Sequence, residues 1–532
     1  MVVKKVAVIG GGVSGLVSIK TCLEEGFEPV CFEQTDQYGG IWVLRDEKPS
    51  GPCPAAGIYD SLLTNSSKDM MCFSDFPFEG SLPPYLRRKD LLEYYRAYTL
   101  QFDLERYIRL NTFVKAVEQT DDFERTGQWR VTTQTEGRCE EEEIFDAVFV
   151  CTGRHTEVSI PDVPGMSDFR GKIKHSGDFK NGREYVDKTV VVVGGSHSAG
   201  DVAVDISRHA KQTYLSTKTG AWVLPREGPG GTPIDAFVNR RLAGLLPRPV
   251  FRNLIRLHVR ERMNMNQLGL QSERPLFQTT SLMVNDEIGI RIWCGSLKSK
   301  PKISKFTETG VVFDDGTEVD DVDAVVFATG FEAKFPYLDA SILRHNHPDP
   351  ELYWHVFPPR LARHTMAVIG IVASVGAQGP VYEMQARLAG RVFKGAVELP
   401  GQDEMLADVA RRKGMYFKNF GNHKVFFPPI PYMDMIAMKI GCRPAFKDLL
   451  KTDPSLAYKF IFGPNYPMFY RLVGAHAWHG ARDAIFRAPA DTAKATKTRS
   501  VTSPTPDIPD TRIFGKLMMA VVLIVLLIGI LA

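Results

Sequence analysis

The sequence of 532 residues predicts an α/β fold with two Rossmann-like dinucleotide-binding units, the second inserted into the first, and a C-terminal membrane anchor helix. Two glycine-rich turns, at 10–15 and 194–199, each follow an apolar run that is typical of a buried parallel strand. Two further apolar runs, 145–150 and 322–328, each lead into Thr-Gly. We expect each of these runs to close the unit that its glycine turn opened. A chain of this length also needs more than one hydrophobic core.

The first glycine turn has the strict sequence G-x-G-x-x-G. Gly10 permits the tight turn, Gly12 lets the backbone approach a pyrophosphate, and Gly15 lets the helix pack on the strand. The pyrophosphate would lie at the N-terminus of the following helix, and Glu33, at the end of the next apolar run, would accept hydrogen bonds from ribose hydroxyls. The expected cofactor contacts here are Gly10, Gly12, Val13, Ser14, Gly15 and Glu33.

The second glycine turn is looser, because it reads G-G-S-H-S-A. Thr217 stands where Glu33 stands in the first copy, and Lys218 follows it. A cation in place of an acid suits a 2′-phosphate, so this copy is predicted to prefer NADP to NAD. The alternative is that Lys218 is a solvated surface lysine. The expected contacts here are Gly194, Ser196, His197, Ser198, Ala199, Ser216, Lys218 and Arg226.

Composition excludes several other classes of protein. The net charge of +3 comes without a basic stripe, which argues against nucleic-acid binding. The eight cysteines are scattered and include no C-x-x-C, which argues against a zinc knuckle or a redox-active disulfide and fits a reducing compartment. No metal-ligand spacing, Ser-His-Asp arrangement or paired carboxylates stand out, so we expect no metal.

The C-terminal region differs from the rest of the chain. Residues 517–532 carry no charge, and with the apolar residues before Lys516 the segment 513–532 is just long enough to span a bilayer or to embed from one side. The N-terminus is no signal peptide, because the first strand already begins there. The predicted organisation is 1–155 for the first part of the first unit, 156–330 for the second unit with an irregular insertion at about 228–285, 331–486 for completion of the first unit, 487–512 for a flexible tether and 513–532 for the anchor.

Residues 251–260 form a basic amphipathic pattern within the insertion. Phe251, Leu254, Ile255 and Val259 share one helical face, and arginines line another. Such a helix either lies on an anionic membrane or docks on its own domain.

Four further motifs, in order along the chain, resemble the flavin-containing monooxygenases of the animal, membrane-associated branch. Residues 169–179 resemble the family's F-x-G-x-x-x-H-x-x-x-[FY] sequence, and 327–331 resemble its F-A-T-G-Y. Residues 39–42, G-G-I-W, resemble the motif near the flavin, and 59–73 resemble the segment with the active-site asparagine. The second glycine turn departs from the usual G-x-G-N-S-G/A at Ser196 and His197, which leaves NADP retention open.

The resemblance implies FAD in the first unit, NADPH in the second, and an endoplasmic reticulum membrane protein with its catalytic body in the cytosol. It implies that NADPH reduces FAD, that O₂ then gives a C4a-(hydro)peroxyflavin, and that this adduct oxygenates a soft nitrogen or sulfur nucleophile of a small xenobiotic or metabolic substrate. Asn65, supported by Ser66, would donate to the peroxide oxygens; alternatively Asn65 only caps the next helix. The other implied flavin or nucleotide contacts are Gly40, Trp42, Thr64 and Thr329. His175 is interpreted as structural.

Three alternatives remain open from the sequence: Baeyer–Villiger oxygenation of ketones, an NADPH oxidase that releases hydrogen peroxide, and a membrane-tethered nucleotide sensor without turnover. The intact first turn, with Glu33 and Asn65, argues against the sensor. A disulfide reductase is disfavoured because no C-x-x-C pair is present. The physiological substrate and the oligomeric state are not predicted.

Overall fold

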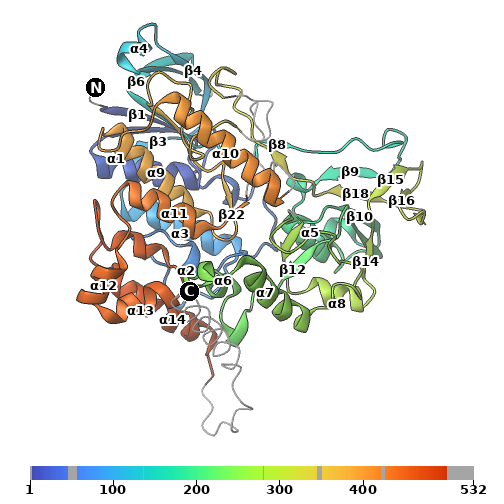
Figure 1. The fold of residues 1–532 in the computed structure, drawn as a ribbon. Helices are drawn as coiled ribbons and strands as arrows, with labels where there is room; N and C mark the ends of the chain where they lie inside the picture. Colours follow the sequence, from blue (N-terminus) through green and yellow to red (C-terminus); the bar gives the residue numbers. More distant parts are fainter. Residues whose placement is uncertain are drawn as a thin grey trace.

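The computed structural model of the protein describes residues 3–45, 57–135, 137–279, 281–343, 350–420 and 426–499. A five-stranded parallel sheet forms the core of the first body, with strand order β20-β7-β1-β2-β3. Its strands are β1 (Lys5–Ile9), β2 (Glu28–Phe32), β3 (Ile108–Arg109), β7 (Ala147–Val150) and β20 (Met366–Val368). This body lies on the left in Figure 1.

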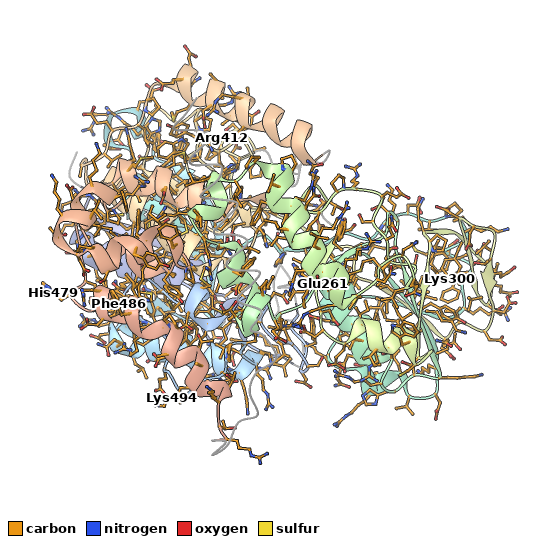
Figure 2. All side chains as sticks on the ribbon, turned by 60° about the horizontal axis from the view of Figure 1, so that its bottom comes forward. Glu261, Lys300, Arg412, His479, Phe486 and Lys494 are labelled. Carbon is orange, nitrogen blue, oxygen red and sulfur yellow. The ribbon has the colours of Figure 1, made fainter. Side chains whose placement is uncertain are left out.

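A second five-stranded parallel sheet, order β14-β11-β10-β18-β9, lies on the right in Figure 1. Its strands are β9 (Lys172–His175), β10 (Thr189–Val193), β11 (Gln212–Ser216), β14 (Leu297–Lys300) and β18 (Ala324–Phe327). All five fall between β7 and β20 in the chain, so the second sheet is inserted into the first unit. The parallel sheets confirm the predicted α/β class with two Rossmann-like units; the C-terminal anchor helix and the precise domain bounds stay predictions. Figure 2 shows Lys300 of this sheet at the end of the molecule opposite His479.

The chain passes between the two bodies through a short antiparallel ribbon. β8 (Glu157–Val158) pairs with β19 (Phe331–Glu332). The ribbon is closed by hydrogen bonds from the Thr156 hydroxyl to the Glu332 carbonyl at 2.9 Å and from Ser159 N to the Gly330 carbonyl at 3.0 Å. Two antiparallel sheets flank the bodies: β4 (Thr112–Gln119), β5 (Trp129–Thr135) and β6 (Glu140–Phe145), and β15 (Ile303–Phe306), β16 (Val311–Phe313) and β17 (Glu318–Val319).

Helices cover both sheets. In the first body α1 (Val13–Glu25) packs closely on α9 (Gly379–Phe393), where a Cβ at Gly390 would lie 2.6 Å from the Thr21 methyl group. In the second body α5 (His197–Ile206) and α8 (Ile288–Trp293) lie together over the strands. The remaining helices of the first body are α2 (Lys68–Met71), α3 (Arg88–Gln101), α4 (Phe123–Thr126), α10 (Gln402–Phe420), α11 (Pro429–Lys439), α12 (Phe446–Thr452), α13 (Pro454–Phe462) and α14 (Ala481–Thr496).

The irregular insertion begins and ends at two paired strands, β12 (Trp222–Leu224) and β13 (Leu282–Val284), and contains α6 (Ile234–Val238) and α7 (Arg248–Arg262). Ile255 and Val259 of α7 are 0% and 1% exposed and pack in the core of the second body, whereas Arg256 and Arg260 are exposed. The apolar face of this helix is therefore used inside the protein. Of the two interpretations of residues 251–260, the structure supports the helix docked on its own domain.

The prediction of a flexible tether from residue 487 is wrong for its first ten residues, because α14 extends to Thr496. Ala481, Ala484, Ile485 and Ala488 are buried at i, i+3, i+4 and i+7, so α14 packs one helical face against the core, and Ala488 of the predicted tether belongs to that face. The predicted anchor, 513–532, lies outside the described residues. Within the described ranges, no helix is long and apolar enough to cross a membrane.

Candidate active site

Both glycine turns open onto one cavity of about 1190 Å³. Ligand cavities typically enclose about 300–1,000 Å³, so this one has room for more than a single small molecule. Its walls come from the carboxyl ends of strands in both sheets, which is where open α/β sheets bind ligands. The predicted site residues on its wall are Gly10, Gly12, Val13, Ser14, Glu33, Gly40, Trp42, Thr64, Asn65, Ser66, Gly194, Ser196, His197, Ser198 and Thr329.

The first glycine turn has the backbone of a pyrophosphate site. Gly10 has φ +103°, and a Cβ at Gly15 would lie 1.9 Å from the Gly10 carbonyl oxygen, so the helix reaches the strand only with glycine there. Gly12, in extended conformation, precedes α1, and no side chain caps the helix. Gly40 approaches Gly12 so closely that a Cβ would meet its Cα at 3.0 Å. This glycine cradle fits the diphosphate of FAD, because Gly12, Val13 and Ser14 at the start of α1 line the cavity.

Glu33 is fixed at the edge of this cradle. One carboxylate oxygen accepts from Gly11 N at 2.7 Å, and the other accepts from Thr35 N at 3.0 Å and from its hydroxyl at 2.7 Å. The side chain is buried, yet it lines the cavity. A carboxylate offers about four acceptor positions, so lone pairs remain for the ribose hydroxyls of FAD.

The second glycine turn likewise precedes a helix, α5, but two of its side chains form hydrogen bonds with β13. Ser196 precedes the helix without capping it, and its hydroxyl donates to the Leu282 carbonyl at 3.2 Å. His197 Nδ1 accepts from Val284 N at 3.1 Å. Burial, with the charges of Arg226 and Arg154, lowers the pKa of His197 to about 4, so the imidazole is neutral at physiological pH. The amides at the start of α5 thus fit the phosphates of NADP.

Five predicted site residues lie off the cavity wall. Gly15 and Ala199 act in helix–strand packing, and the Ser216 hydroxyl donates to the Pro301 carbonyl at 2.8 Å. Lys218 is exposed, which is compatible with both of its interpretations. The fifth residue, Arg226, faces the segment that carries Asn65.

Arg226 is 9% exposed and pairs with Asp286 at 2.8 Å. Its Nε donates to the Thr64 carbonyl at 3.1 Å, and its Nη2 donates to the Asn65 carbonyl oxygen at 3.3 Å. These contacts give Arg226 a different setting from the predicted 2′-phosphate site, because its guanidinium holds the Asn65 turn, residues 64–67. The phosphate role stays a prediction.

Asn65 is half-buried and lines the cavity beside Ser66. It does not cap the next helix, because α2 begins at Lys68 with Ser67 in the capping position. The capping interpretation of Asn65 is therefore wrong. Since Arg226 holds its carbonyl oxygen, the NH₂ group of Asn65 is the part that can donate to a bound cofactor or substrate.

His175 has the structural setting that the sequence indicated. It is buried, its Nδ1 accepts from Gly177 N at 3.0 Å, and its ring packs edge-on against Phe331 with centroids 4.8 Å apart. It is not on the cavity wall.

Several charged residues on the wall were missed, among them Arg154 and Asp235. Arg154 is half-buried and makes no hydrogen bond or ion pair with any residue that the structure describes. Its place four residues after β7, at the carboxyl edge of the sheet, was a usable signal. Asp235 of α6 is 5% exposed, and nothing in the local sequence of the insertion indicated it.

Comparison with known proteins agrees with this architecture. Residues 3–532 match the flavin-binding monooxygenase-like family. Human flavin-containing monooxygenase 5 is 40% identical over 539 residues, which cover 99% of this chain and 100% of that protein.

Solved structures share the fold. S-allyl-L-cysteine S-oxygenase from Allium sativum matches with a TM-score of 0.64 at 24% identity, covering 92% of this chain and 99% of that one. Cyclohexanone monooxygenase from Rhodococcus sp. Phi1 bound to NADP⁺ matches with a TM-score of 0.57 at 18% identity, covering 83% and 98%. The chain thus belongs to the flavin-containing monooxygenase family and is an enzyme that uses FAD and NADPH.

Proposed function

We propose that this enzyme oxygenates soft nitrogen or sulfur nucleophiles of small xenobiotic or metabolic molecules with NADPH and O₂. One observation carries the proposal: two uncapped helix N-termini and the Asn65 turn line a single cavity. The residues predicted for FAD, the residues predicted for NADP and a neutral amide donor therefore line the same cavity, which supports the proposal. No acid or base on the wall is required, because a flavin oxygen adduct is already an electrophile.

Different residues would bind the two cofactors and contact the reacting oxygen atoms. The N-terminus of α1 and Glu33 would hold FAD, and the N-terminus of α5 would hold NADP. FAD, when bound there and reduced by NADPH, would supply the activation of O₂. The NH₂ group of Asn65 would donate to the oxygen atoms, with its orientation fixed by Arg226. The enclosing walls would exclude water and suppress loss of the oxidant as peroxide.

Stopped-flow absorbance tests the proposal. NADPH-reduced, FAD-loaded enzyme is mixed with O₂, first alone and then with an amine or a sulfide. We expect a long-lived intermediate that decays on addition of the nucleophile, with one oxygenated product per NADPH. Lactone or ester from a ketone would instead indicate Baeyer–Villiger chemistry, and hydrogen peroxide without product would indicate an oxidase. Absence of reduction by NADPH would contradict all three.

Two variants examine the role of Asn65. Asn65→Ser removes the amide donor, and we expect the intermediate to decay faster by about tenfold or more, which corresponds to loss of one hydrogen bond to a charged oxygen. The matched control is Asn253→Ser on α7, which is exposed and lies off the cavity wall. Equal decay rates in the two variants would contradict the role.

We also propose that residues 513–532 attach the enzyme to the endoplasmic reticulum membrane, with the catalytic body in the cytosol. The support is the uncharged run 517–532. Cell fractionation of the full chain and of a chain ending at residue 512 tests this; an unchanged membrane fraction would contradict it.

A further inference from the structure

Asp235 is a buried carboxyl on the cavity wall that the proposed oxygenation does not use. It lies in α6, within the insertion of the second body. One of its oxygens accepts from Ser67 N of the first body at 2.7 Å, and the other accepts from Ala236 N at 2.9 Å. The contact joins residues 168 positions apart and reaches the Asn65 turn two residues beyond Asn65.

The insertion therefore holds the Asn65 turn with two groups of opposite charge. Arg226 donates to the carbonyl oxygen of Thr64 and to the side-chain oxygen of Asn65, and Asp235 accepts from the N–H of Ser67. After Ser67 the chain is held by its own body, because the Lys68 ammonium donates to the carbonyls of Glu79, Gly80 and Leu82. Thr64 is also held by its own body, because it exchanges hydrogen bonds with Leu86 in both directions at 2.9 Å. Residues 65–67 are therefore the part of the Asn65 turn whose position depends on the second body.

The carboxyl of Asp235 has no ion-pair partner among the residues that the structure describes. The negative charge of Asp235 acts on the nearby phenols of Tyr85 and Tyr466. Burial, the largest effect, raises the pKa of Asp235 to about 6, against the opposing influence of the Ser67 and Ala236 amides. An uncompensated buried carboxylate destabilises a fold, and such groups concentrate at functional sites.

We propose that Asp235 is a positioning residue whose ionised carboxylate, through Ser67 N, fixes the Asn65 turn, so that the active-site wall is set by the insertion and loosens when Asp235 is protonated. A carboxylate accepts a stronger hydrogen bond than a neutral carboxylic acid or amide does. Below its pKa, Asp235 carries an O–H group. This group needs a hydrogen-bond acceptor, whereas Ser67 N–H is a donor. The catalytic consequence rests on the proposed function, but the positional one does not.

Hydrogen exchange of the FAD-loaded full chain tests the positional part without turnover. At pH 8, Asp235→Asn is expected to speed amide exchange in peptides covering 63–71 by about tenfold, because one charge-assisted hydrogen bond becomes a neutral one. The matched control is Asp201→Asn, since Asp201 also lines the cavity but accepts from the Tyr59 hydroxyl and Asn285. It should leave exchange in 63–71 unchanged. Unchanged exchange in Asp235→Asn would overturn the proposal.

A pH profile separates positioning from a purely structural role. We expect the kcat of the wild type to rise with pH through about 6, which gives the pH profile an acidic limb. Asp235→Asn should lower kcat, leave KM unchanged and abolish this acidic limb. A limb that persists in the variant would overturn the proposal. If Asp235→Asn does not fold, wild-type exchange at pH 8 and 5.5, corrected for intrinsic rates, must show the same loosening confined to 63–71. A positive exchange result with no oxygenation would reject the proposed function and leave this inference standing.

Discussion

The two glycine turns occupy equivalent places in the two sheets, yet different parts of the chain hold them. Each follows the central strand of its sheet, β1 or β10. Each donates from its first glycine to the end of the neighbouring strand, Gly10 N to the Phe32 carbonyl at 2.8 Å and Gly194 N to the Ser216 carbonyl at 2.9 Å. Glu33 and Thr217 therefore occupy equivalent positions, one residue after the neighbouring strand ends. This agrees with the sequence comparison of the two copies, which predicted NADP for the second unit because no acid stands at this position.

The support of the two turns differs. The first turn is held within its own βαβ unit, by the contact of Gly15 with Gly10 and by Glu33 on Gly11 N. The second turn has a serine and a histidine where glycine and asparagine are usual, and both of these side chains form hydrogen bonds with β13, at the end of the insertion. The first turn is thus a local structure, whereas the second depends on the packing of the insertion.

The largest difference in flavin content between variants of the two turns is expected when the last residue of each turn, Gly15 or Ala199, is replaced. In Gly15→Ala the new Cβ would lie 1.9 Å from a backbone oxygen that cannot move, so we expect loss of FAD binding. Ala199→Gly adds no atom and should cost about 1 kcal/mol of helix stability. Flavin absorbance per protein after gel filtration measures both. Full flavin content in Gly15→Ala would contradict the local character of the first turn.

The next effect concerns His197. Its pKa is about 4 when folded and 6.5 in the reference state, so the unfolded chain binds more protons between these values and stability falls as pH decreases through 6.5. The loss amounts to about 2 kcal/mol at pH 5 relative to pH 8. Urea unfolding at both pH values should show a loss about 2 kcal/mol smaller in His197→Asn than in wild type, because other buried groups such as His355 titrate in both proteins. His209→Asn, beyond the end of α5, is the control and should keep the full loss of the wild type.

A smaller effect is expected at Lys218. If this exposed lysine contacts the 2′-phosphate, Lys218→Ala should raise the dissociation constant of NADP⁺ by about tenfold and leave that of NAD⁺ unchanged. Isothermal titration of the FAD-loaded protein with each nucleotide measures this, with exposed Lys211→Ala as the control. Equal changes for both nucleotides would show that Lys218 is a solvated surface residue.

The smallest effect should follow Ser196→Gly, which restores the usual glycine. It removes the hydrogen bond to the Leu282 carbonyl, worth about 1 kcal/mol, while glycine before the helix costs only a few tenths of a kcal/mol. We expect NADP⁺ affinity to change by less than about threefold. A larger loss in the same titration would mean that the hydroxyl contacts the nucleotide directly.

Much of the candidate site could be predicted because it is local. A strand, a tight glycine turn, a helix and a second strand between residues 5 and 33 fix where Gly10, Gly12 and Glu33 lie. Helix α14 was missed for the opposite reason, since its alanines acquire a pattern only when the core they face is known.

The sequence by itself determined the two nucleotide-binding units and their order, because short-range patterns encode turns and helix starts. Its resemblance to a known family indicated the asparagine that lines the cavity. Only the tertiary structure decided what holds that asparagine. Arg226 and Asp235 reach the Asn65 turn across 161 and 168 residues of chain. A hydrogen bond depends on distance in space, and no spacing in a single sequence records which distant groups packing brings within hydrogen-bond distance.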